Sequence, residues 1–158
     1  MPESATTTAT IRSTGDEHEL MLERLLPAPP DRVFDAWVNP EILVKWWGPE
    51  GFSTPELSLD VSTHGKWRTV MLSPDGERHI VSGVYLAIDR PVRLVFSWGW
   101  ENEDGSDGHE SEVELTFRAA GSGTHLKLIH RRLEHTESRE NHRLGWDSSL
   151  NDLERVFV

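Results

Sequence analysis

Six stretches of alternating apolar and polar residues follow one another between residues 57 and 131, and they constrain the fold more than any other feature. They cover Leu57–Val61, Lys66–Leu72, Arg78–Ile88, Val92–Trp100, Glu110–Arg118 and Thr124–Arg131. A period of two residues is typical of strands with one buried face. Short Gly- and Pro-containing turns separate several of these stretches, so consecutive strands are expected to pair antiparallel.

An amphipathic helix is predicted directly after these strands, from about Glu137 to Phe157. Its apolar residues Trp146, Leu150, Leu153 and Phe157 recur at spacings of four, three and four, which places them on one face. Such a face has to be buried against another apolar surface. We therefore expect the helix to cover the apolar face of the sheet.

The segment before residue 57 predicts one more strand and two short helices. His18–Leu26 is apolar-rich and ends at a Pro-rich turn, as a first strand would. Helical spacing then runs from Pro30 to Asn39, and a second short helix begins at Pro40 and ends at Gly48. The predicted fold class is α+β, with a seven-stranded antiparallel sheet, two short helices after the first strand and a long C-terminal helix.

Composition excludes several classes of protein. The 158 residues include no cysteine, which excludes disulfides, thiolate metal sites and a cysteine nucleophile. The net charge is −11 and no run of Lys and Arg is longer than Arg131-Arg132, so we expect no nucleic-acid partner. The chain shows neither a signal peptide nor a membrane-spanning segment, so we expect no membrane insertion and a cytoplasmic location.

The chain is expected to hold one domain. Residues 1–16 are rich in Thr, Ser and Ala and contain few large apolar groups, so they are predicted to be a flexible tail. Residues 17–158 form the predicted single domain, a length that suits one hydrophobic core.

Seven tryptophans are unusual in an acidic domain of this size. For any single one, core packing is the simpler interpretation, but the set favours a cavity with aromatic walls. Adjacent Trp46 and Trp47 diverge by about 100° on a helix, so one of them is expected to face the entrance. The residues predicted to line the cavity are Trp37, Trp46, Trp47, Trp67, Met71, Phe96, Trp98, Trp100, His130, Trp146 and Leu150.

His130 is the polar candidate within this set. Strand alternation places it on the inward face with Leu126 and Leu128, where an imidazole can bond a ligand or titrate near neutral pH. The simpler interpretation is a core histidine with satisfied hydrogen bonds. Because His125 and His130 lie on opposite faces of one strand, no metal site is predicted. No cofactor motif or nucleophile motif occurs, so His130 is the sole, weak catalytic candidate.

Several motifs resemble proteins related to the activator of heat-shock-protein-90 ATPase, in the START-like (SRPBCC) superfamily. They are Phe34-Asp-Ala-Trp37, Asn39-Pro-Glu41, Lys45-Trp-Trp-Gly-Pro-Glu-Gly-Phe52, Gly65-Lys-Trp-Arg68 with Met71, Pro74-Asp-Gly76, Gly83-Val-Tyr-Leu86 with Ile88, Arg93-Leu-Val-Phe96 with Trp98, and Gly145-Trp146 with Leu150 and Leu153. The resemblance covers residues 18 to 157. In one departure, the chain has Ala87 where members often carry an acidic residue, so no acid or base role is assigned there.

This resemblance implies the helix-grip fold, in which a seven-stranded sheet wraps around the C-terminal helix and leaves an apolar cavity that opens near the short helices. It implies as the leading function the binding of a small apolar, lipid-like or aromatic molecule, without evident catalysis. The alternatives are an enzyme of the cyclase or hydrolase type acting on a cavity-bound ligand, with His130 as general acid or base, and a module that contacts the chaperone.

Overall fold

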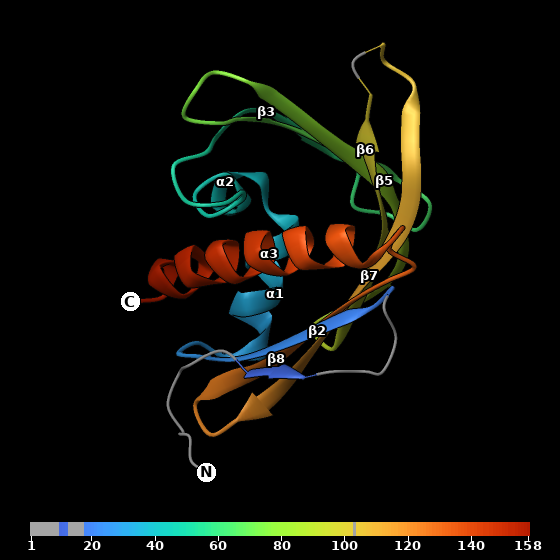
Figure 1. Ribbon diagram of the computed structural model, residues 1–158. Coiled ribbons are helices and arrows are strands. Elements are labelled where there is room, and N and C mark those ends of the chain that lie inside the picture. The colour runs from blue at the N-terminus through green and yellow to red at the C-terminus, as the bar shows by residue number, and fades with distance from the viewer. Residues whose placement is uncertain (1–9, 13–17, 103) are drawn as a thin grey trace.

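In the computed structural model, which describes residues 10–12, 18–102 and 104–158, the sheet has eight antiparallel strands (Figure 1). The strands are β1 (Thr10–Arg12), β2 (Leu20–Leu26), β3 (Ser53–Leu59), β4 (Lys66–Leu72), β5 (Arg78–Asp89), β6 (Arg93–Glu101), β7 (Asp107–Ala120) and β8 (Gly123–Arg131). The helices of these residues are α1 (Pro30–Val38), α2 (Pro40–Leu43) and α3 (Thr136–Val156).

The sheet has the strand order β1-β2-β8-β7-β6-β5-β4-β3. Strands β2 and β3 therefore lie near opposite edges of the sheet, and the chain passes from one to the other through α1 and α2. Figure 1 shows the sheet curving around α3, with α1 and α2 on the same concave side. The predicted fold, a curved antiparallel sheet wrapped around a long C-terminal helix, is confirmed.

Local sequence explains where the helices begin. Pro30 occupies the first turn of α1, where its missing N–H costs no hydrogen bond, and Asp31 lies near the positive end of the helix. The side chain of Asn39 accepts a hydrogen bond from the backbone N–H of Glu41 and caps α2. The ring of His135 accepts from the backbone N–H of Ser138 and caps α3.

The core fills the space between the concave face of the sheet and the helices. Leu22, Val113, Leu115 and Leu128 from neighbouring strands are fully buried. Helix α3 adds the buried residues Trp146, Leu150 and Leu153, which are three of the four predicted on its apolar face. Burial of each such side chain contributes on the order of 2 kcal/mol, so this face fixes α3 against the sheet.

The largest differences from the predicted boundaries occur in three elements. The first of the six strands was expected at Leu57–Val61 but is Ser53–Leu59, because the chain turns at residues 60–65 and leaves Val61 exposed. Strand β7 begins at Asp107 rather than Glu110, since the polar hairpin continues to pair beyond the apolar alternation. Helix α2 ends at Leu43, and hydrogen-bonded turns carry the chain on to Trp47.

Strand β1 pairs with β2 and lies within the segment predicted as a tail. The remainder of that segment, residues 1–9 and 13–16, lies outside the described residues. None of the described helices is long and apolar enough to cross a membrane.

Candidate functional site

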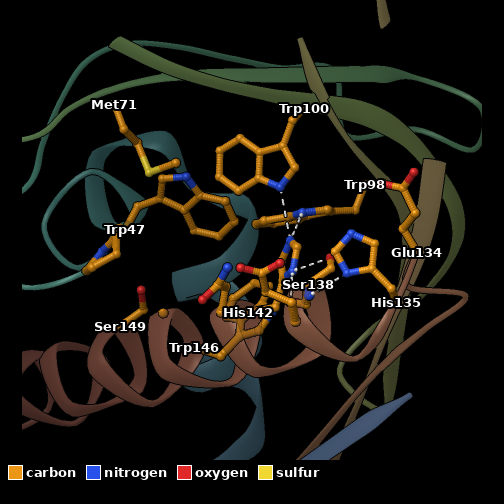
Figure 2. A pocket seen from close by; sticks show the side chains of 15 residues that line it. Trp47, Met71, Trp98, Trp100, Glu134, His135, Ser138, His142, Trp146 and Ser149 are labelled. Atoms are coloured by element: carbon orange, nitrogen blue, oxygen red, sulfur yellow. Dashed lines mark hydrogen bonds between the residues drawn. The ribbon is translucent and has the colours of Figure 1, made fainter. Parts of the chain in front are cut away.

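A pocket of about 530 Å³ opens beside the N-terminal half of α3 (Figure 2). Strands β4 and β6 and the turn after α2 form the facing wall. Its lining residues are Trp47, Gly48, Pro49, Met71, Trp98, Trp100, Glu134, His135, Glu137, Ser138, Asn141, His142, Gly145, Trp146 and Ser149. The volume is within the range of pockets that bind small molecules.

Four tryptophans form the apolar wall of this pocket. The ring centroids of Trp98 and Trp146 are 5.0 Å apart, and Trp47 lies 5.9 Å from Trp98 and 5.8 Å from Trp146. Trp100 packs edge-on against Trp98 at 5.7 Å. These distances are typical of favourable aromatic pairs, so the wall is held together by ring contacts from three parts of the chain.

His142 on α3 joins this wall to the helix. Its Nε2 accepts hydrogen bonds from two indole groups, Trp98 Nε1 at 3.2 Å and Trp100 Nε1 at 3.0 Å. Its Nδ1 donates to the backbone carbonyl of Ser138 at 2.7 Å. Because an indole nitrogen only donates and a carbonyl oxygen only accepts, this arrangement requires neutral imidazole with the hydrogen on Nδ1. Burial lowers the pKa of His142, although the hydrogen bond to Ser138 acts in the opposite direction.

His130 lies behind this wall, with its ring centroid 4.8 Å from that of His142. Its Nδ1 accepts from Trp146 Nε1 at 3.0 Å, so its Nε2 carries the hydrogen and donates to Ser111 Oγ at 2.7 Å. Burial lowers the pKa of His130 well below its ordinary value, and nearby His142 adds to this effect. Both ring nitrogens are thus bonded within the core, and His130 is not among the residues that line the pocket.

The predicted cavity residues separate into three groups. Trp47, Met71, Trp98, Trp100 and Trp146 line the pocket. Trp37, Trp67 and Phe96, together with Trp47, border a separate cavity of about 20 Å³, which has room for about one water molecule. Trp46 and Leu150 pack in the core, where the Trp46 ring lies 4.5 Å from that of Trp37. Of the adjacent pair Trp46 and Trp47, Trp47 is the one that borders the pocket.

Sequence reasoning missed the polar side of the pocket, which consists mainly of residues 134–149. His142 was not among the residues predicted to line the cavity. Its position four residues before Trp146 places both on one helix face, and this spacing is the signal that predicts their proximity. Among the described residues, no three His, Asp or Glu side chains are grouped as metal ligands would be.

Residues 27–157 match a protein family described as "Activator of Hsp90 ATPase homolog 1-like protein". No curated protein matches the chain.

Solved structures of similar proteins have the same fold. The AHSA1 protein of Silicibacter pomeroyi is 35% identical, with a TM-score of 0.81, and the match covers 87% of this chain and 95% of that one. A Chromobacterium violaceum protein is 29% identical, with a TM-score of 0.78 and coverage of 87% and 96%. An Arthrobacter aurescens protein has a TM-score of 0.85 at 19% identity, with coverage of 96% and 92%, and shows likeness of fold alone.

Proposed function

The chain belongs to the family of activator of Hsp90 ATPase homolog 1-like proteins, and we propose that it binds a small apolar or aromatic molecule in the pocket beside α3. The observation that carries this proposal is the pocket of about 530 Å³ with four tryptophans in its wall. Aromatic walls suit flat or apolar ligands, and the polar residues on the α3 side would fix their orientation.

Tryptophan fluorescence tests this proposal directly. Titration with a panel of fatty acids, lipids and polycyclic aromatic compounds should give a saturable change for at least one class. The signal arises because Trp47, Trp98, Trp100 and Trp146 lie at the pocket. A panel without any saturable change would contradict the proposal.

Gly145 offers a variant that closes the pocket without damage to the fold. A Cβ added there meets only Pro49, at 3.9 Å, and Gly145 lies in α3 among the lining residues. We expect Gly145→Leu to remain folded and to weaken ligand binding at least about tenfold, because the side chain occupies ligand space. The measurement is the same fluorescence titration.

Gly145→Ala is the matched control. Alanine favours a helix over glycine by about 1 kcal/mol, so thermal stability should rise while ligand affinity stays near that of the wild type. Equal affinities for Gly145→Leu and Gly145→Ala would show that the ligand binds elsewhere.

The description of the family favours a second candidate function, contact with the Hsp90 chaperone. The test is the ATPase rate of Hsp90 with and without this protein at low salt. If both functions exist, Gly145→Leu should weaken ligand binding and leave the ATPase effect unchanged, since Gly145 lies among the residues that line the pocket. No effect on the ATPase rate, and no complex, would exclude the chaperone function.

A further inference from the structure

The tryptophans of the pocket wall offer a ligand ring surface rather than hydrogen-bond donors. Trp47 Nε1 donates to Thr69 Oγ1 at 3.0 Å, and the other three indole N–H groups donate to His130 and His142. The remaining N–H of His142 is used on the backbone of Ser138. Each of these polar hydrogens is therefore already bonded inside the protein. The surface that these tryptophans offer to a ligand is therefore aromatic carbon, and the ring faces carry the negative part of the ring quadrupole.

Among the described residues that line the pocket, the two charged ones are acidic. They are Glu134 and Glu137, both exposed, and the other described lining residues include neither Lys nor Arg. Neither carboxylate forms an ion pair with another described residue. The N-terminus of α3 is close by, but its roughly half unit of positive charge is smaller than the charge of two carboxylates, and His135 already accepts the N–H of Ser138.

We propose that the pocket selects organic cations, in which an amine or quaternary ammonium group is attached to an apolar or flat aromatic body. The body packs against the indoles, and the cationic group lies at the mouth beside Glu134 and Glu137, where it is attracted by the carboxylates and by the ring faces. This inference rests on the proposed binding function and gives the chemical class of the ligand.

Three ligands of similar shape test which ligand charge the pocket prefers. They are naphthylmethylamine, which is cationic at neutral pH, neutral naphthylmethanol and anionic naphthoate. Dissociation constants are taken from the NMR signals of the indole N–H groups during titration at low salt. We expect the amine to bind about tenfold more tightly than the alcohol, and naphthoate to bind more weakly than the alcohol.

Two double variants separate the effect of Glu134 and Glu137 on ligand affinity from the effect of the net charge of the protein. Glu134→Gln with Glu137→Gln should remove most of the advantage of the amine and leave the affinity for the alcohol unchanged. Glu41→Gln with Glu110→Gln changes the net charge equally at exposed residues outside the pocket and should keep that advantage.

The outcomes distinguish the two proposals. If the alcohol binds in the pocket but the amine has no advantage, or naphthoate binds most tightly, the inference about cations is overturned and the binding function stands. An advantage of the amine that is undiminished without the carboxylates of Glu134 and Glu137 also overturns the inference. If none of the three ligands shifts an indole signal, the inference about cations is overturned, and the fluorescence titration with the full panel decides the binding function.

Discussion

The free energy of unfolding should fall steeply as the pH drops below about 6.5, because His130 and His142 are buried as neutral rings. The pKa of each is lowered by burial, whereas a histidine in the unfolded chain takes up a proton near its ordinary pKa of 6.5. The unfolded state therefore binds more protons below that pH. Stability is fully present above the unfolded pKa and is lost as the pH falls toward the folded pKa values.

The hydrogen bonds explain why the folded state resists this protonation. A proton on Nε2 of His142 would face the N–H groups of Trp98 and Trp100, and a proton on Nδ1 of His130 would face that of Trp146. Each histidine contributes a limiting slope of about 1.4 kcal/mol per pH unit. Urea unfolding from pH about 7.5 to about 5 measures the combined slope.

His142→Gln isolates the contribution of one ring. The amide oxygen of glutamine keeps an acceptor for the indoles but does not titrate, so the slope should decrease by about 1.4 kcal/mol per pH unit. His79→Gln is the control, because His79 is half-buried on β5 away from the pocket. A wild-type slope in His142→Gln, or constant stability down to pH about 5, would contradict this explanation.

The fold follows largely from residue patterns. Strand β4 was predicted with its observed bounds because turn residues flank it, and β8 to within one residue because its buried residues alternate without interruption. The errors occur where local pattern and tertiary contacts compete. A regular helix separates adjacent side chains by about 100°, but Trp46 and Trp47 are both buried, and the chain leaves α2 at Leu43 to allow this.

The site was less accessible to sequence reasoning than the fold. Strand alternation indicates which side chains point inward, and it correctly places His130 inside, but it does not show how far each lies from solvent. The predicted cavity residues lie partly at the pocket, partly at the small cavity beside Trp37 and partly in the packed core. This division depends on how α3 lies across the sheet, because α3 brings His142 to Trp98 and Trp100 from 42 or more residues away along the chain.

One core residue does not follow from any pattern. Strand alternation places Arg24 of β2 on the same inward face as Leu22 and Leu26, where a charged residue is not expected. Its side chain does face the core there, and Arg24 is only 3% exposed. Its Nη2 donates to the Asp147 carboxylate at 2.8 Å and to the Asp147 backbone carbonyl at 3.2 Å, and Glu154 lies 4.0 Å from its Nη1. The guanidinium thus joins β2 to α3 beneath the helix.

Asp147→Ala should lower the free energy of unfolding by about 3 kcal/mol, because it leaves the cation of Arg24 buried without its close counter-charge. Arg24→Met should cost less, within about 1 kcal/mol, since methionine fills similar apolar space and the carboxylates can turn to water. The Asp147 side chain is already 38% exposed and that of Glu154 is 25% exposed, which makes their solvation inexpensive. Urea unfolding of the single variants and of the double variant measures these differences.

Asp152→Ala is the matched control on the same helix. Asp152 pairs with Arg155, which is largely exposed, and the loss of such a surface pair costs less than about 1 kcal/mol. Arg24→Met in the background of Asp147→Ala should recover most of the lost stability, because it removes the unpaired charge. If Arg24→Met destabilises the protein as much as Asp147→Ala does, the guanidinium itself stabilises the junction between β2 and α3, and the cost lies in the lost contact rather than in an unpaired charge.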